Sequence, residues 1–466
     1  MGSFGATLLS ISIVVVPSFL KVRAAEATPF QPARTRAVAA NPSPDIPEYA
    51  HPLEDLSKSV GWDAVKGVDW LDVGINSRLR YENRENDYSS PRLISDDAFY
   101  NQTLVYLGVR EVIDPLRLAG EFQDARRALT DRPPSASEQD HTDALQAHAD
   151  LYFKEAMGGQ SLDLTAGRMT LDLVDRRLVS RTRFNNVINS FDGFRVRLGD
   201  ERKPWEVNVI AVSPVERNVN EFDERLNNIW MYGVTGAWRS ASPAFQFEPF
   251  WLYLDQNAER TAPLERTLNT FGFHAFGLWN ARTWDYDVSL VGQIGETRGL
   301  PQRAWAAHAE VGYTWRVPWR PRVAVWLNYA SGDHDPGDGV QQRFDPLFGA
   351  TFAFYGYSGY FNWQNIVEPS IRFSAQPTEK LRTEIIYRGY ALASAKDAWV
   401  RGLRIDPSGT SGSFIGQELD VRVAYPIWRF FEVEVVYAHF FPGEFVANTG
   451  PSPQSNFTYL QGTLRF

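Results

Sequence analysis

The chain has 466 residues, of which 44% are hydrophobic and 14% aromatic, and its formal net charge is -9. It has no cysteine, which excludes disulfide scaffolds, thiolate metal sites and cysteine nucleophiles. The negative charge argues against a nucleic-acid-binding protein that acts through its overall field. Beyond the N-terminus there is no run of 18 uncharged apolar residues, which excludes membrane-spanning helices. A transmembrane β-barrel stays possible, because its strands alternate apolar and polar residues.

The N-terminus has the pattern of a secretory signal. An apolar stretch over residues 6–20 is followed by small residues at Ala24 and Ala25, so we expect a signal peptide over residues 1–25. A buried helix is the alternative. Residues 26–68 include the stretch "NPSPDIPEYAHP", are rich in proline and lack a regular pattern. We interpret them as a periplasmic lead-in.

From Asp69 onward the hydrophobic pattern has a period of two. In "GINSRLRY", Ile75 and Leu79 share one face while Arg78 and Arg80 share the other. About eighteen such segments occur, each long enough for a tilted strand that crosses the outer membrane. We place their starts near residues 70, 99, 115, 142, 160, 191, 204, 228, 244, 268, 284, 304, 320, 364, 380, 416, 430 and 456.

The connections between these segments alternate in length. Short links lie at residues 113–115, 158–159, 200–203, 240–243, 282–283 and 376–379, and long ones at 85–98, 127–141, 169–190, 331–363 and 394–415. Outer-membrane barrels have short periplasmic turns and long extracellular loops, whereas soluble sandwiches and propellers do not sort loops in this way. We therefore predict an all-β fold over residues 69–466: a transmembrane antiparallel β-barrel of about 18 strands in the bacterial outer membrane.

The last segment, "NFTYLQGTLRF", keeps the same alternation through Phe466. Leu460, Leu464 and Phe466 share one phase, which predicts a strand that closes the barrel with an aromatic residue at the membrane interface. The ending is similar to the signal that bacterial barrel assembly machinery reads. Lipids of the outer membrane and that machinery are therefore expected partners, and nucleic acid is not.

Arginine makes up 40 of the 47 basic residues of the chain, and many of these arginines fall on the predicted lumen face. With the apolar phase facing lipid, the arginines that point inward are Arg78, Arg80, Arg110, Arg195, Arg197, Arg239, Arg316, Arg322, Arg372, Arg388, Arg422 and Arg465. Such a lining lowers the barrier for anions and can bind carboxylates. The same phase carries Glu82, Asp285, Asp287, Glu310, Glu418, Asp420, Glu432 and Glu434. Pairing of these charges to brace the wall is the alternative, and codon usage can also raise the arginine content.

The sequence offers no pattern for catalysis or for a cofactor. It has no nucleophile elbow and no recognisable triad, so we do not expect an enzyme. His141 and His148 lack zinc-ligand spacing, and no metal site is predicted. The stretch "GDHDPGDG" brings Asp333, Asp335 and Asp338 together and could hold calcium, but these residues are also typical of a turn, which is the preferred interpretation.

Two long motifs resemble the alginate export family of outer-membrane porins. They are "GRMTLDLVDRRLVSRTRFNNVINSFDGFRV" at residues 167–196 and "SGDHDPGDGVQQRFDPLFGATFAFYG" at residues 331–356. Met169 and "GAT" at residues 349–351 depart from the family pattern. The resemblance implies a monomeric, eighteen-stranded barrel that passes an anionic polysaccharide through an arginine-rich channel.

The resemblance also implies that Arg168 points into the pore. Simple alternation instead places Arg168 in phase with Leu162 and Leu164, unless a bulge at Gly167 turns it inward.

The predicted function is an outer-membrane porin, without a cofactor, for an alginate-like anionic polysaccharide or a related anionic solute. One alternative is a nutrient-uptake porin for sugars or small organic anions. A second is a non-conducting surface scaffold or adhesin. The sequence leaves the substrate and the direction of transport open.

Overall fold

The computed structural model describes residues 46–466 except residues 62, 91, 131, 134, 201–202, 240–242, 260–263 and 281–282. The predicted signal peptide and most of the predicted lead-in therefore lie outside the described residues.

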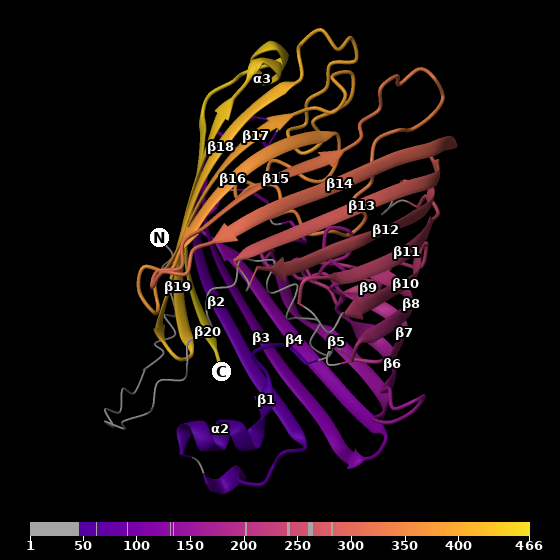
Figure 1. Ribbon diagram of the computed structural model, residues 1–466, viewed down its shortest axis with the longest axis vertical. Helices are drawn as coiled ribbons and strands as arrows, with labels where there is room; N and C mark the ends of the chain where they lie inside the picture. The colour runs from indigo at the N-terminus through magenta and orange to yellow at the C-terminus, as the bar shows by residue number, and fades with distance from the viewer. Residues whose placement is uncertain are drawn as a thin grey trace, which may run out of the picture.

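Eighteen antiparallel strands form a closed barrel (Figure 1). The strands are β2 (Leu71–Glu85), β3 (Asp96–Ile113), β4 (Leu116–Ala128), β5 (Asp140–Phe153), β6 (Leu162–Met169), β7 (Phe191–Leu198), β8 (Trp205–Glu216), β10 (Ile229–Arg239), β11 (Gln246–Gln256), β12 (Arg266–Trp279), β13 (Trp284–Thr297), β14 (Leu300–Thr314), β15 (Arg322–Ala330), β16 (Ile366–Ala375), β17 (Arg382–Ala391), β18 (Phe414–Trp428), β19 (Phe431–Pro442) and β20 (Ser455–Arg465). The predicted fold class is confirmed, and every predicted start lies within four residues of an observed one.

The barrel closes where β20 pairs with β2. The register runs from Asn76 opposite Arg465 to Glu85 opposite Asn456. Just beyond it, the amide of Phe466 donates to the carbonyl of Ile75 (2.8 Å), and the amide of Ile75 donates back (2.6 Å). The predicted closing strand is thus present, and the closure leaves these two strands without a free edge along their paired length.

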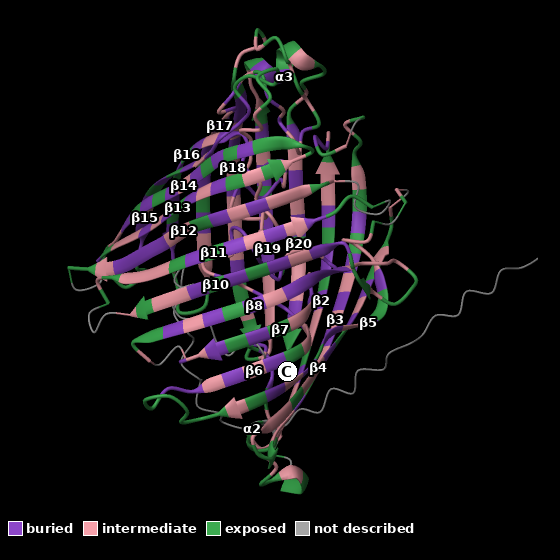
Figure 2. Ribbon diagram, turned by 90° about the vertical axis from the view of Figure 1, so that its right-hand side faces the viewer, coloured by how far each residue is buried: buried purple, intermediate pink, exposed green. Residues whose placement is uncertain are grey.

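Along the strands, buried residues alternate with more exposed ones (Figure 2), as side chains that point in turn to the lumen and to the outer surface do. On β2, Ile75 and Leu79 are exposed on the outside, whereas Arg78 and Arg80 are buried inside. Trp279, Trp284 and Trp315 gather on the outer surface near the short turns, with neighbouring ring centroids of Trp279 and Trp284 6.1 Å apart. Aromatic side chains in such a belt suit the boundary between lipid and water.

Short turns gather at one end of the barrel and long connections at the other. Arg429 and Phe430 join β18 to β19, whereas residues 392–413 join β17 to β18. The end with the short turns is the periplasmic end. One connection departs from the pattern: β13 and β14 are joined at the long-loop end by the two-residue turn Arg298–Gly299.

The remaining elements are short. They are β1 (His51–Pro52), α2 (Leu53–Val60), the 3-10 helix η1 (Asp63–Val65), β9 (Glu224–Arg225) and α3 (Glu444–Thr449). The strand β1 pairs with the start of β2, and α2 lies at the periplasmic end of the barrel (Figure 1). Among the described residues, no helix is long and apolar enough to cross a membrane.

Two of the long connections fold into the barrel, which corrects the expectation that they face outside. The first inner loop, residues 170–190, and the second inner loop, residues 331–365, both leave from the extracellular end. Val179 and Trp363 are nevertheless fully buried, and they belong to a hydrophobic core inside the barrel. The alternation of short and long connections predicts only the end of the barrel at which a loop begins. Packing against the lumen wall decides whether the loop folds into the barrel.

Candidate functional site: the lumen and its two inner loops

The two inner loops dock on each other inside the lumen. Val179 and Phe348 form a parallel β-bridge. The amide of Ser180 donates to the carbonyl of Phe348 (3.1 Å), and the amide of Phe348 donates to the carbonyl of Leu178 (2.9 Å). These bonds satisfy backbone groups that would otherwise be buried without partners. The loops therefore form one inner structure across the lumen.

Two wall arginines hold the first inner loop. Arg78 on β2 donates to the carbonyl oxygens of Arg183 (2.8 Å) and Asn185 (2.9 Å). Arg80, two residues further along the same face, donates to the carbonyl oxygen of Phe184 (2.8 Å). The forked guanidinium can serve several carbonyls at once. Arg78 and Arg80, which were both predicted to line the lumen, thus face inward, and both donate hydrogen bonds to the backbone of the first inner loop.

A buried arginine on β17 holds the second inner loop. Arg388 donates to the carbonyl oxygens of Ala353 (3.1 Å) and Phe354 (3.3 Å). On the neighbouring strand, the carboxylate of Glu418 accepts a hydrogen bond from the amide of Tyr357 (2.9 Å). The wall thus supplies both a donor and an acceptor, and the loop backbone is bound at fixed positions.

Most of the predicted lumen arginines also form ion pairs with carboxylates. The pairs are Arg80–Glu82 (2.7 Å), Arg110–Asp72 (3.0 Å), Arg197–Asp163 (3.0 Å), Arg195–Asp163 (3.8 Å), Arg239–Glu206 (3.0 Å), Arg322–Glu310 (2.8 Å), Arg372–Glu384 (3.2 Å), Arg388–Glu368 (2.6 Å), Arg388–Asp420 (3.0 Å) and Arg422–Glu434 through Nε (2.8 Å). Removing one partner of a buried pair leaves an uncompensated charge. This pattern supports the interpretation that many of these charges brace the wall.

Three of the predicted arginines lie elsewhere. Arg168 is the register partner of Asp192, and its Nε is 2.8 Å from that carboxylate. The register of β6 runs through Gly167 without a shift, so the bulge that would turn Arg168 inward is not present. Arg168 therefore keeps the outward phase at the extracellular end of its strand. Arg316 lies after β14 on an exposed turn, and Arg465 is exposed at the periplasmic end of β20.

An aromatic cluster surrounds Arg80 where the inner loops meet. The guanidinium lies over the rings of Phe184 (4.0 Å), Tyr100 (5.3 Å) and Tyr459 (5.9 Å). Phe184 in turn stacks on Phe352 of the second inner loop. Guanidinium and aromatic groups attract each other in this arrangement. The meeting point of the loops therefore combines positive charge with flat apolar surface.

The sequence reasoning missed the arginines of the first inner loop. Arg183 pairs with Asp172 (3.1 Å) and with Glu48 of the lead-in (3.5 Å), and its side chain is 46% exposed. Burial would raise the pKa of Asp172, but Arg183 and Arg176 hold that pKa below its ordinary value. These residues fall inside the motif at residues 167–196. The two-residue alternation stops within this motif, so the sequence pattern did not place these arginines in the lumen.

The aspartates of "GDHDPGDG" serve the turn itself. Asp335 accepts a hydrogen bond from the amide of Gly337 (3.4 Å), and Asp338 accepts one from the amide of Val340 (2.8 Å). Within the described part of the chain, Asp333, Asp335 and Asp338 do not converge as a metal-ligating group. The turn interpretation therefore agrees with the geometry.

A different carboxylate group lies at the extracellular end of β5. Asp140, Asp143 and Asp223 bring carboxylate oxygens within 4.8 Å of one another. Arg168 lies 3.6 Å from Asp143, so a cation already sits beside this group.

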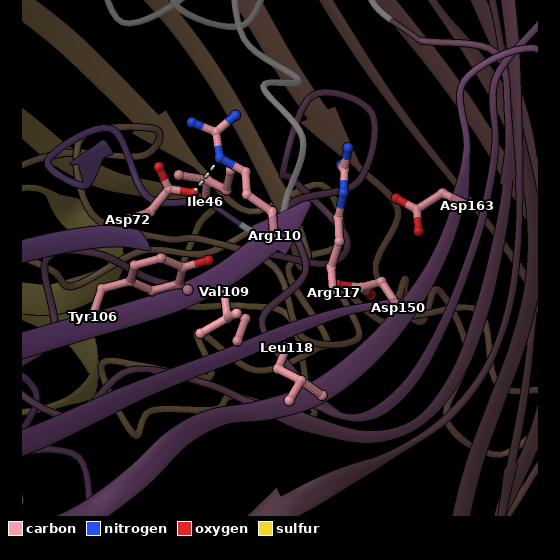
Figure 3. A pocket seen from close by; sticks show the side chains of 11 residues that line it. Ile46, Asp72, Tyr106, Val109, Arg110, Arg117, Leu118, Asp150 and Asp163 are labelled. Carbon is pink, nitrogen blue, oxygen red and sulfur yellow. Dashed lines mark ion pairs between the residues drawn. The ribbon is translucent and has the colours of Figure 1, made fainter. Parts of the chain in front are cut away.

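A small cavity opens on the periplasmic side of the lumen (Figure 3). Arg110 from β3 and Arg117 from β4 extend from neighbouring strands into the same space, with Asp72 beside the first (Figure 3). Arg117 lies over the ring of Tyr152 at 3.6 Å. Asp150 and Asp163 also line the cavity, which is therefore of mixed charge.

Comparison with known proteins agrees with the geometry. Residues 69–459 match the model of a protein family described as alginate export. A search of curated proteins finds no significant match.

Solved barrels show the same fold at low sequence identity. OpdO of Pseudomonas aeruginosa has a TM-score of 0.58 at 12% identity, covering 85% of this chain and 97% of that one. OccAB2 of Acinetobacter baumannii has a TM-score of 0.59 at 10% identity, with 85% and 98% covered. The outer membrane protein OpdK of Pseudomonas aeruginosa has a TM-score of 0.57 at 12% identity, with 85% and 98% covered.

Proposed function

The chain belongs to the alginate export family and resides in the bacterial outer membrane, and from this premise we propose that it is a channel for an anionic polysaccharide of the alginate kind or a related anionic solute. The solute would pass beside the inner loops, and its carboxylates would bind one arginine side chain after another. The observation that carries the proposal is the environment of Arg183.

Arg183 presents a half-exposed guanidinium inside the barrel. Its two carboxylate partners, Asp172 and Glu48, come from different segments and lie 3.1 Å and 3.5 Å away. Ion pairs at exposed positions contribute little free energy, so a carboxylate of a solute can replace one of them at small cost. Arginine also matches the planar geometry of a carboxylate.

The predicted arginines then divide into two roles. We propose that Arg110 and Arg422, whose side chains are 29% and 24% exposed, contact the solute together with Arg183. Arg78, Arg80 and Arg388 instead hold the inner loops. Their neutralisation would disturb the inner loops themselves, so they make poor probes of selectivity.

The test is ion selectivity in planar bilayers. Arg183→Gln keeps hydrogen-bonding capacity and removes one lumen charge, so the reversal potential in a salt gradient should move towards cation preference and block by an oligouronate should weaken. Arg126→Gln is the matched control, because Arg126 has a similarly exposed side chain (45%) and pairs with Asp124 on the outer face. Its currents should equal those of the wild type.

Two results would overturn the proposal. A cation-selective wild type that oligouronates do not block would leave a general porin. A folded, inserted barrel that carries no current would favour the surface scaffold.

A second candidate function is uptake of small organic anions. It is favoured by the half-buried rings of Phe184 and Phe352 beside Arg80, which suit an aromatic carboxylate better than a sugar chain. One of the structurally similar barrels, OpdK, is described in a complex with vanillate. Block by vanillate without block by an oligouronate, lost in Phe184→Leu, would support this candidate.

A further inference from the structure

The end of the lead-in enters the barrel from its periplasmic edge. His51 and Pro52 pair with Val73 and Asp72 on β2. This pairing uses the part of β2 that lies before its register with β20, which starts at Asn76. From there the preceding residues run along the lumen face, since Tyr49 and Ala50 are both buried.

A glycine on the wall makes room for this segment. A Cβ atom at Gly74 would lie 2.7 Å from the Cα of Ala50 and 2.7 Å from the carbonyl oxygen of Tyr49. Both contacts are with backbone atoms, so rotation of a side chain could not relieve them. Tyr49 and Ala50 also pack in one apolar cluster with Leu104, Tyr106, Leu145 and Ile188, the last from the first inner loop.

The lead-in shares a buried carboxylate with the first inner loop. The hydroxyl of Tyr49 donates to Glu121 on β4, and the guanidinium of Arg181 binds the same carboxylate oxygen. Glu121 is fully buried, so both bonds form away from bulk water, where they are stronger. The pair of Glu48 and Arg183 adds a second, exposed link between the same two segments.

We propose that residues 46–50 form an internal plug, which narrows the periplasmic half of the lumen, holds the first inner loop in place and leaves when the channel opens. The presence of the plug rests on the channel function but not on the choice of solute, whereas its release by the solute rests on the proposed anionic solute. The plug can leave without breaking the barrel, because its described residues take no part in the strand pairing, which in this segment involves His51 and Pro52 of β1.

Binding of the solute would also favour departure of the plug. Glu48 occupies Arg183, the guanidinium that we propose binds a solute carboxylate. Solute and plug would therefore compete for one group, and binding of the solute would shift the population towards the open state.

The first test adds a methyl group where the plug touches the wall. Gly74→Ala should expel residues 49–50 and raise single-channel conductance in potassium chloride severalfold. Gly120→Ala is the matched control on β4, because a Cβ there meets its nearest atom at 3.8 Å. Its conductance should equal that of the wild type. Heat-modifiable gel mobility verifies that each barrel is folded.

The second test leaves every barrel strand unchanged. Tyr49→Ala combined with Glu48→Gln removes both polar links from the lead-in side, so it should raise conductance even if Gly74→Ala fails to assemble. Folded variants with wild-type conductance would overturn the plug. The measurement uses simple salt, so a failed plug is separate from a failed anion preference, which the reversal potential reports.

Discussion

Val179 and Phe348 form a parallel β-bridge inside the barrel, and this bridge joins the two inner loops into one structure. Each loop alone would expose unpaired backbone groups to the lumen. Joined to each other and held by Arg78 and Arg388, the loops are fixed at both the centre and the wall.

Apart from the exposed tip of the second inner loop, residues 334–339, the inner loops should be inaccessible from outside the cell. The chain has no cysteine, so single cysteines can report accessibility without background. Asp338→Cys, on the exposed tip of the second inner loop, should react with a membrane-impermeant maleimide on intact cells. Val179→Cys, which is fully buried, should not. Met157→Cys lies on a periplasmic turn and should react only after permeabilisation. Strong labelling at position 179 on intact cells would show that the first inner loop lies outside.

Arg388→Gln should destabilise the barrel. Arg388 is fully buried between Glu368 and Asp420, so its neutralisation leaves two buried carboxylates without their cation. The expected cost is about 3–5 kcal/mol of unfolding free energy, measured by urea unfolding in lipid vesicles.

Adding Glu368→Gln to Arg388→Gln should restore part of this loss. Arg126→Gln, which breaks an exposed pair, should change the free energy by less than about 1 kcal/mol. A null effect of Arg388→Gln would mean that water reaches the two carboxylates.

Removal of Phe466 should reduce assembly into the outer membrane. The deletion removes two backbone hydrogen bonds with Ile75 and an edge-to-face contact with Phe430, whose ring centroid is 5.3 Å away. Phe466→Tyr keeps the ring and the backbone and should assemble normally. The measurement is the folded fraction in membranes by gel mobility without heating. Equal amounts of the deletion variant and the wild type would contradict the role given to this contact.

The extracellular loop at residues 217–228 should be more stable at mildly acidic pH. The pKa of Asp223 is raised to about 6, because burial and the neighbouring Asp143 raise it by more than Asn218 and Arg168 lower it. A carboxyl whose folded pKa is raised stabilises the fold while protonated, so stability should fall as pH rises from about 4 to 6.

Protease protection of this loop, measured at pH 5 and pH 7, should therefore decrease at the higher pH. Asp223→Asn should reduce the difference. A wild-type loop that is equally protected at both values would contradict the prediction.

The sequence determined the wall of the barrel. Alternation placed Ile75 and Leu79 outside and Arg78 and Arg80 inside, because a strand sends successive side chains to opposite faces whatever surrounds it. It also identified the strand that closes the barrel. For Arg168 the alternation and the family resemblance predict different orientations, and the register of β6 runs through Gly167 without a shift.

Only the tertiary structure decided what fills the barrel. Nothing in the local pattern shows that Arg78 holds the carbonyl of Arg183, or that Tyr49 reaches Glu121 on β4. These contacts join segments far apart in the chain, and a loop without periodicity carries no signal of the surface on which it packs. The sequence therefore supplied the charges of the lumen, whereas the folded inner loops and the lead-in decided which of those charges hold protein and which face the lumen.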